Sequence, residues 1–387
     1  MRVLFAISPG LDHLYPTVGL AWSLRAAGHQ VVVATSGKSV EAAARAGLTA
    51  RDVSPDADFA AVFPKRGTRA ERAAAMRELG LTFAKTLQAP DSILEKFSQV
   101  SDLMVNGTAQ LARSWKPDLI VYSRLQGAAL VVARELGIPA VEHGFNFLRD
   151  GGLPRRFLTY LAPVYERMGV PAELPSISRV YFAPQSMMLG EGDGWGMRIL
   201  PFHGGAVLPD WMAEPKERPR VCVTLGTAVP GMAGIVSLRG VMDAASDVDA
   251  EFVLALGDDP ELDQLGTLPD NVRVVGWTPL STLLETCDGI IHHGGAQTTL
   301  ASAQTGVPQL VLPHGADNWI NGGIAERYGI GLQRDTAEID AETLHTLLED
   351  DALRKSAQAL AVELAVEPGA EHIVPRLSEL AGAGARR

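Results

Sequence analysis

Cysteine is nearly absent from this chain of 387 residues, which has only Cys222 and Cys287, each in or beside a short apolar run. Two thiols placed in this way suit neither a disulfide framework nor a metal cluster, so we expect a reducing, cytoplasmic setting. No uncharged apolar run reaches the roughly 18 residues of a membrane span. The apolar start at Met1–Ile7 lacks the basic region and cleavage site of a signal peptide.

Basic residues are also scarce, with 34 Lys and Arg against 45 Asp and Glu and a net charge of −11. We therefore expect no nucleic-acid partner, because such a partner requires a basic face. A single phosphorylated small molecule remains compatible, since backbone N–H groups can hold a phosphate. Hydrophobic residues make up 47% of the chain and charged residues 20%, a composition that fills a core and argues against disorder.

Short apolar runs alternate with amphipathic stretches in both halves of the sequence. This β-α-β succession predicts an α/β fold of two Rossmann-like, doubly wound parallel-sheet domains that face a cleft. The expected strands are Val3–Ile7, Gln30–Ala34, Leu119–Tyr122, Ala140–His143, Val221–Leu225, Phe252–Leu256, Val272–Val275, Gly289–His292 and Gln309–Leu312. The expected helices include Leu14–Ala27, Gln126–Leu136, Pro279–Thr286 and Thr298–Gln304. Ligands in such folds bind at the carboxyl ends of the strands.

The domain boundary is predicted in Leu200–Arg220, which is rich in proline and carries a Gly-Gly pair. We accordingly expect a first domain over residues 1–205, a second over 206–370, and a C-terminal helix or tail at 371–387 that packs back on the first. The less regular stretch Asp52–Gln99 is expected to insert in the first domain and shape a pocket.

The first strand leads into Ser8-Pro9-Gly10-Leu11-Asp12-His13, just before the expected helix, with Pro16 in the first turn of that helix. The spacing is not Gly-x-Gly-x-x-Gly, so a dinucleotide fingerprint is missing. A histidine at a helix N-terminus is kept neutral by the helix dipole and can take a proton as a general base. The alternative for His13 is a capping or partly buried histidine without chemistry.

A glycine-rich turn with paired histidines follows the expected strand Gly289–His292. The turn comprises His293, Gly294, Gly295, Ala296, Gln297 and Thr298, and it opens a helix. Bare N–H groups and the helix dipole favour a diphosphate there, and His293 can add a hydrogen bond. The alternative is an ordinary βα turn, while a zinc site is disfavoured because no acidic ligand is adjacent.

Three further strand ends carry candidate binding residues. Asp317 and Asn318 combine an acid with an amide, a pair suited to sugar hydroxyls, although Asp317 could instead be a helix cap. Trp277, followed by Thr278, could stack on a planar base or be a core tryptophan. Thr227, after Gly226, lies in another turn that could face a phosphate.

Taken together, the motifs resemble the GT-B-fold family 1 glycosyltransferases over essentially the whole chain. The most similar stretch, from Val275 to Asn321, contains GWTPL, HHGGAQTT and GVPQLVLPHGADNWIN. The pieces AISPGLDHLYP, GGAVLP, FVLALGD and LGTLP place the resemblance in the actinomycete natural-product branch, closest to calicheamicin-type enzymes.

The resemblance implies a role for each matching residue. His13 matches the general base in the loop Pro9, Gly10 and Leu11, and Trp277 matches the residue that stacks on the nucleotide base. The matching diphosphate site is His293, Gly294, Gly295, Ala296, Gln297 and Thr298, with Thr227 near the phosphates and Thr278 beside the stacking residue. Asp317 and Asn318 match the acid–amide pair at the donor sugar. The first domain would bind the acceptor and the second the nucleotide sugar.

Two departures from the family pattern stand out. Many relatives have Asp-Gln where this chain has Asp317-Asn318. The shorter amide is expected to change which hydroxyls of the donor sugar are hydrogen-bonded. Many also have an aspartate that orients the base histidine, where this chain has Ser123. Ser123, Asp12 and Glu142 are the candidate partners of His13 here; without a carboxylate partner, His13 would depend on a more acidic acceptor hydroxyl.

The resulting hypothesis is an inverting glycosyltransferase of antibiotic biosynthesis. It would move a deoxysugar from a dTDP-sugar to a hydroxyl of a hydrophobic enediyne or polyketide aglycone, with Phe145–Tyr165 and Asp52–Gln99 lining the acceptor pocket. No cofactor or metal is expected, since the helix start would stabilise the leaving diphosphate. The Asp247-Val248-Asp249 string precedes a strand, at the wrong end for a donor site.

Two alternatives to sugar transfer stay open. A nucleotide-sugar 2-epimerase of the same architecture would also hold a diphosphate with a glycine-rich turn, but would need no roomy acceptor pocket. A glycosyltransferase-like auxiliary protein would bind and activate a partner without catalysis. Homodimer formation also stays open at this stage.

Overall fold

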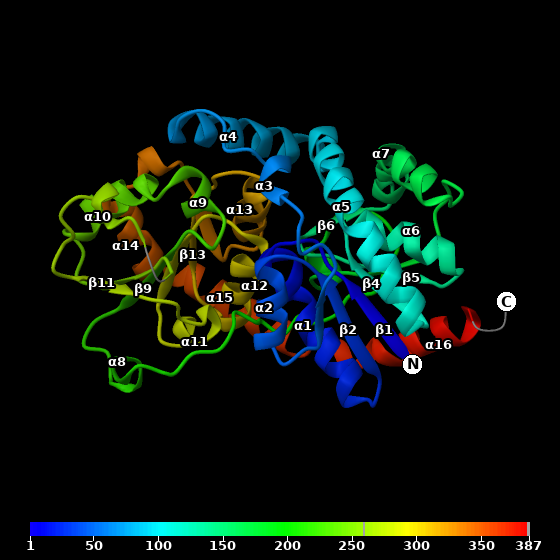
Figure 1. The fold of residues 1–387 in the computed structure, drawn as a ribbon. Coiled ribbons are helices and arrows are strands. Elements are labelled where there is room, and N and C mark those ends of the chain that lie inside the picture. Colours follow the sequence, from blue (N-terminus) through cyan, green and yellow to red (C-terminus); the bar gives the residue numbers. More distant parts are fainter. Residues whose placement is uncertain (258–259, 385–387) are drawn as a thin grey trace. The chain divides into compact units, whose positions relative to one another are not determined.

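Two compact units, each built on one six-stranded parallel sheet, make up the protein in the computed structural model, which describes residues 1–257 and 260–384 (Figure 1). The alternation of strands and helices therefore produces the predicted α/β class in both halves. Within the described residues, no helix combines the length and apolar character needed to cross a membrane.

The sheet of the first unit has the order β3-β2-β1-β4-β5-β7, with every neighbouring pair parallel. Its strands are β1 (Arg2–Ala6), β2 (Gln30–Thr35), β3 (Ala50–Asp52), β4 (Leu119–Ser123), β5 (Ala140–His143) and β7 (Ile177–Val180). The chain winds outward from β1 in both directions, so the loops after β1 and β4 diverge at the centre of the sheet. Ligands of doubly wound folds bind at such a reversal point.

Helices cover this sheet because its central strands are apolar on both faces and must be buried on both. They are α1 (Leu11–Ala26), α2 (Lys38–Arg45), α3 (Phe59–Val62), α5 (Asp91–Trp115), α6 (Gly127–Leu136), α7 (Leu153–Met168) and α16 (Val374–Gly384). One core cluster joins Leu4 and Ile120 of the sheet to Met104 of α5 and Phe157 of α7. A two-stranded sheet of β6 (Leu148–Asp150) and β8 (Leu189–Glu191) lies after β5 in the chain.

The second unit repeats the plan with the order β11-β10-β9-β12-β13-β14. Its strands are β9 (Arg220–Thr224), β10 (Glu251–Ala255), β11 (Val272–Val275), β12 (Gly289–His292), β13 (Gln309–Val311) and β14 (Gly331–Gln333). Its helices are α4 (Arg69–Thr86), α8 (Asp210–Ala213), α9 (Val229–Ala233), α10 (Arg239–Ala245), α11 (Leu280–Leu284), α12 (Ala296–Thr305), α13 (Asn318–Arg327), α14 (Ala341–Glu349) and α15 (Asp351–Ala365). The reversal point here lies between β9 and β12.

The helix predicted over Leu14–Ala27 begins three residues earlier, at Leu11, so its predicted start was wrong. Pro16 consequently lies in the second turn rather than the first. A proline there removes one helical hydrogen bond and crowds the preceding turn. The earlier start places His13 inside the first turn, as the third residue of α1.

The domain prediction was wrong for one segment of the first half. Lys65–Thr86, which contains α4, belongs to the second unit together with His203–Val366. The first unit comprises Met1–Pro64, Leu87–Phe202 and the chain from Glu367 onward, and α16 contacts α1 and β4 there. Of the predicted tail at 371–387, residues 385–387 lie outside the described part of the chain.

Candidate active site

His13 lies at the reversal point of the first sheet, directly after β1. The loop before it is Ser8 to Gly10, and Leu11 is the first residue of α1. Ser8 donates its backbone N–H to the Ser123 hydroxyl at the end of β4 (3.1 Å), which ties the two central strand ends together. A Cβ at Gly10 would lie 3.2 Å from the His13 ring, so a side chain at this position would crowd the histidine.

The His13 ring is neutral and enclosed by aromatic side chains. Burial lowers its pKa below the ordinary value, and the carboxylate of Asp12 only partly opposes this shift. Phe145 contacts the ring edge-on at 4.6 Å between centroids, and Phe97 of α5 lies at 5.4 Å. The buried Nδ1 atom has no hydrogen-bond partner among the described residues. A neutral imidazole with an unused ring nitrogen is suited to accept a proton.

The three predicted partners of His13 have different surroundings. Asp12 places a carboxylate oxygen 3.9 Å from His13 Nε2, although 69% of its side chain is exposed. The Ser123 hydroxyl accepts the Ser8 N–H, so its observed contact is with the β1 backbone. Glu142 accepts a hydrogen bond from Arg124 Nε at 3.0 Å, and both side chains are buried. Asp12 is thus the one carboxylate that the described contacts place at His13.

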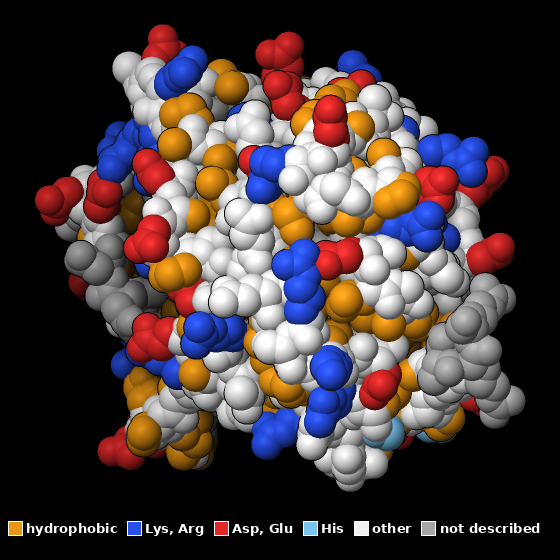
Figure 2. All heavy atoms as spheres, turned by 45° about the vertical axis from the view of Figure 1, so that its right-hand side comes forward, with side chains coloured by type: hydrophobic (Ala, Val, Ile, Leu, Met, Phe, Trp, Pro, Cys, Tyr) orange, Lys and Arg blue, Asp and Glu red, His pale blue; other side chains and the backbone are white. Residues whose placement is uncertain are grey.

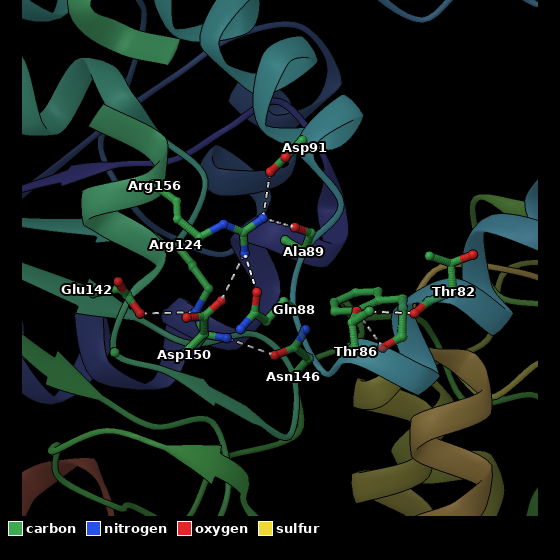
Figure 3. Close-up of polar contacts among 12 residues, drawn as sticks. Thr82, Thr86, Gln88, Ala89, Asp91, Arg124, Glu142, Asn146, Asp150 and Arg156 are labelled. Carbon is green, nitrogen blue, oxygen red and sulfur yellow. Dashed lines mark hydrogen bonds and ion pairs between the residues drawn. The ribbon is translucent and has the colours of Figure 1, made fainter. Parts of the chain in front are cut away.

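Arg124 bonds to Glu142 and Asn146, two residues that flank Phe145 in the sequence (Figure 3). Its guanidinium donates to Glu142 and, through Nη1, to the amide oxygen of Asn146 at 3.1 Å. Asn146 uses the same oxygen to accept the Leu148 N–H. This ion-paired arginine fixes the backbone on both sides of Phe145, and hence the aromatic wall of His13.

The sequence interpretation missed a second neutral histidine, His143, at the carboxyl end of β5. It is paired in register with Ser123 and is buried. Burial lowers the pKa of His143 to about 4, and the nearby Arg124 charge acts in the same direction, while a hydrogen bond to Gly144 opposes it. Nδ1 contacts the Gly144 carbonyl oxygen at 2.7 Å, so Nδ1 is the donor, and the buried Nε2 has no partner in the described chain. The position of His143 at the end of the predicted strand Ala140–His143 was the signal in the sequence that could have identified it.

A cavity of about 500 Å³ lies among α3, α5 and α7 of the first unit. Its lining includes Val62, Ser98, Tyr160 and Val164, from the two stretches expected to shape the acceptor pocket. His13 is not among its lining residues. Ser98 and Phe97 are adjacent on α5 and therefore point about 100° apart, so the cavity and the His13 wall occupy different faces of that helix.

In the second unit, the predicted glycine-rich turn connects β12 to the start of α12. Gly295 precedes α12 as its N-cap, and no side chain caps this helix. The first-turn N–H groups of a helix lack intrahelical partners and carry the positive end of the dipole. Burial, with smaller contributions from His292 and His314, lowers the pKa of His293 to about 3, so the ring is neutral. Its buried Nδ1 has no partner among the described residues.

The two glycines of this turn have different tasks. The Gly294 N–H donates to His292 Nδ1 at 3.1 Å, so it is occupied inside the protein. Gly294 has φ 85°, and a Cβ on it would lie only 2.9 Å from the Asn318 carbonyl oxygen. A Cβ at Gly295 would lie 2.5 Å from His293 Nε2. Gly294 therefore serves close packing of the turn, and Gly295 leaves room for the His293 ring.

The turn after β9 lies beside this site. Gly226 has φ 65°, and a Cβ on it would lie 2.6 Å from His293 Cε1. Thr227, which follows it, is exposed. The structure thus brings Thr227 and His293 to one place, the reversal point of the second sheet.

Trp277 and Thr278 follow β11 at the same edge of that sheet. Trp277 is 37% exposed, which a core tryptophan would not be. A Cβ at Gly204 would lie 3.2 Å from its indole Nε1, so the backbone at Gly204 approaches one side of the ring. The Thr278 hydroxyl donates to the Gly276 carbonyl oxygen at 3.2 Å. The exposed ring agrees with the surface position that stacking requires.

Asp317 and Asn318 open α13 after β13. Asp317 is the N-cap residue, without a side-chain hydrogen bond to the helix. The buried Asn318 amide oxygen accepts the N–H groups of His314 (3.3 Å) and Gly315 (3.0 Å). Asn318 therefore closes the turn that presents Asp317, a structural task that its sequence position did not reveal.

Within the part of the chain that the structure describes, no three His, Cys, Asp or Glu side chains are grouped to hold a metal ion. On the surface shown in Figure 2, coloured acidic and basic side chains are interspersed rather than gathered into one basic area.

Comparison with known proteins identifies the family. The model of the erythromycin biosynthesis protein CIII-like N-terminal domain matches residues 22–226, and the C-terminal domain model of the same family matches residues 239–380. The chain belongs to this family of glycosyltransferases. It is 39% identical to the elloramycin glycosyltransferase ElmGT of Streptomyces olivaceus, over 97% of each chain. It is 33% identical to the L-demethylnoviosyl transferase of Streptomyces niveus, over 88% of this chain and 87% of that one.

Solved structures agree with this placement. The glycosyltransferase SnogD from Streptomyces nogalater is 39% identical and superposes with a TM-score of 0.82, over 98% of this chain and 99% of that one. SsfS6 of Streptomyces sp. SF2575, solved with thymidine diphosphate, is 27% identical with a TM-score of 0.79 over the same shares of the two chains. The protein is thus a GT-B glycosyltransferase of the actinomycete antibiotic type, and further relatives that cover 98% of this chain are named as a desosaminyl transferase and a mycaminosyltransferase.

Proposed function

We propose that this glycosyltransferase moves a deoxysugar from a dTDP-sugar to a phenolic hydroxyl of a flat, polycyclic aromatic natural product, with inversion at the anomeric carbon. The observation that carries the donor half is the uncapped start of α12 beside the neutral His293 and the β9 turn. Such a turn binds a diphosphate through backbone N–H groups. The thymidine diphosphate in the SsfS6 structure supports dTDP as the nucleotide.

The surroundings of His13 support an aromatic acceptor. Phe97 and Phe145 flank the ring, and Phe63 contacts Phe97 at 5.7 Å between centroids. Rings in this arrangement pack well against another aromatic system. The calicheamicin-type resemblance favoured an enediyne, whereas the family model and ElmGT are named for erythromycin and elloramycin, so we take the polyketide alternative, and the aromatic wall of His13 favours an aromatic one.

The weak support of His13 favours an acidic hydroxyl. Its nearest carboxylate, Asp12, is 3.9 Å from Nε2 and largely exposed, which is beyond hydrogen-bond distance. Such a histidine is a weaker base than one bound to a buried carboxylate. A phenol, with a pKa near that of tyrosine at about 10, gives up its proton far more readily than an aliphatic alcohol.

The proposed reaction is a single displacement. His13 takes the proton of the acceptor hydroxyl as its oxygen forms a bond to the anomeric carbon, and the bond from that carbon to the diphosphate oxygen breaks. The electron pair leaves with dTDP, whose growing charge the first turn of α12 and a hydrogen bond from His293 stabilise. His13 then returns the proton to solvent. The proposal includes no metal ion.

The test compares two histidine variants. His13→Gln should bind dTDP like the wild type, measured by calorimetry, and should lose transfer to a phenolic aglycone, measured by liquid chromatography and mass spectrometry. His143→Gln is the matched control, because His143 is also buried and neutral in the first unit. Transfer that persists in His13→Gln and disappears in His143→Gln would move the base to His143 and overturn the proposal.

A further inference from the structure

The helix α4 comes from the first half of the sequence and packs within the second unit, where nothing has yet given it a role. Gly80 is its only buried residue. Ala73 and Met76, on the same face, pack against the core of that unit. Residues spaced by three and four positions share one face of a helix. One stripe of α4 is therefore docked, and the remaining residues are half-buried or exposed.

This stripe contacts the turn that presents Asp317. A Cβ on Gly80 would lie 2.5 Å from Trp319 Cζ3 and 3.1 Å from the Gly315 carbonyl carbon. A Cβ on Gly315 would in turn lie 3.1 Å from Met76 Cβ. The backbones of α4 and the turn thus approach as closely as glycine permits, on both sides of Asp317.

Charged side chains hold α4 in this place. Arg77 lies over the Trp319 ring at 5.5 Å and pairs with Asp335 at 2.7 Å. In the first turn of the helix, Arg72 donates to the Met232 carbonyl oxygen at 2.8 Å. Lys65, just before the helix, donates to the Gly231 carbonyl oxygen at 2.8 Å. α4 therefore spans from the segment after β9 to the segment after β13, and each of these contains a candidate donor residue.

We propose that α4 is a positioning element of the donor-sugar site, and that the Gly80–Trp319 contact sets where Asp317 meets the sugar. This inference rests on the proposed function. It assigns part of the sugar specificity to residues 65–86, which the sequence placed in the acceptor domain. Neither Gly80 nor Trp319 need touch the reacting atoms for this.

The contacts of the chain after α4 explain why a change at the Gly80–Trp319 contact should affect the sugar donor and not the acceptor. Arg156 of the first unit donates to the Ala89 carbonyl oxygen and pairs with Asp91, both at 2.7 Å (Figure 3). The chain passes from one unit to the other between Thr86 and Leu87. The acceptor unit thus holds its own side of the connection by independent contacts, so a change at Gly80 should act on the donor turn alone.

The test uses Gly80→Ala with Gly323→Ala as the matched control. Gly323 is an exposed glycine inside α13 whose Cβ would meet no atom within 4 Å. Alanine there should raise Tm by about 2 to 4 °C through helix propensity and leave kinetics unchanged. In Gly80→Ala, the clash with Trp319 should cancel that gain and lower kcat/KM for the dTDP-sugar roughly tenfold to hundredfold. Its acceptor KM and its affinity for dTDP without a sugar should stay at wild-type values.

Two further measurements make the outcome decisive. Gly80→Ala/Trp319→Leu removes the clashing ring and should recover part of the donor kcat/KM. Hydrogen exchange of residues 314–319 should be faster in Gly80→Ala than in the wild type, whatever the protein catalyses. Wild-type exchange and donor kinetics in Gly80→Ala, or equal losses for sugar donor and dTDP alone, would overturn the inference. A wild-type protein that transfers no sugar would refute the proposed function, and the exchange experiment would still decide whether α4 holds the turn.

Discussion

Replacing Trp277 with alanine tests the nucleotide site of the second unit most simply. The ring is 37% exposed and carries little of the core, so its removal should not unfold the protein. Stacking of a base on an aromatic side chain contributes about 1 to 3 kcal/mol. Since each 1.4 kcal/mol is a factor of ten in Kd, dTDP should bind Trp277→Ala about 5- to 150-fold more weakly.

The assay is isothermal titration calorimetry with dTDP at fixed pH and salt. Val274→Ala is the control, because Val274 is also 37% exposed and lies on β11, three residues before Trp277. Trp277→Phe should fall between the wild type and the alanine variant, since a smaller ring keeps part of the stacking. Unchanged affinity in Trp277→Ala, or an equal loss in Val274→Ala, would refute stacking at this position.

Three other outcomes are expected. Burial keeps the pKa of His13 below its ordinary 6.5, so kcat/KM should be flat above about pH 6.5 and fall in more acidic solution; an acidic limb that begins above pH 7.5 would contradict this. His292 and His293 stay neutral when folded, with pKa values of about 4 and 3, so the unfolded chain takes up their protons first as pH falls below 6.5. In urea unfolding, these two histidines alone should therefore lower the free energy of unfolding by about 2 to 3 kcal/mol per pH unit below 6.5, with no such slope above it, and His143 and His203, whose pKa values burial lowers to about 4, should steepen the loss. Glu142→Gln would leave Arg124 buried without its counter-charge and should cost about 3 to 5 kcal/mol in the same assay; an unchanged midpoint would show that the pair is dispensable.

The central strands were predictable because burial on both faces makes them continuous apolar runs. Ala140–His143 and Gly289–His292, which are buried along their whole length, have the bounds that the sequence predicted, and so does Val272–Val275, the partly exposed edge strand of the second sheet. Helix starts were less accessible, since Pro16 was interpreted as a first-turn proline and α1 accommodates it one turn later. Proline is usually tolerated in the first turn of a helix, but the packing of α1 as a whole accommodates Pro16 in the second turn.

The location of α4 could not be inferred from sequence position. Only Gly80 of this helix is buried, and its partners, such as Trp319, are distant in the chain. The same limit applies to Asn318, whose amide closes a backbone turn, and to Gly294, whose N–H is taken by His292. Motif similarity predicts that Asn318 and Gly294 belong to the donor site, while their individual contacts are known only from the fold.

The most direct test of sugar transfer is to incubate the protein with a dTDP-deoxysugar, with and without a polycyclic phenol, and to follow donor and products by liquid chromatography and mass spectrometry. We predict that dTDP and a glycosylated phenol form together, in equal amounts, only when both substrates are present, and that the new linkage has the opposite anomeric configuration to the donor. Conversion of the donor to an epimer without any acceptor, or a complete lack of glycosylated product while dTDP binds normally, would contradict it.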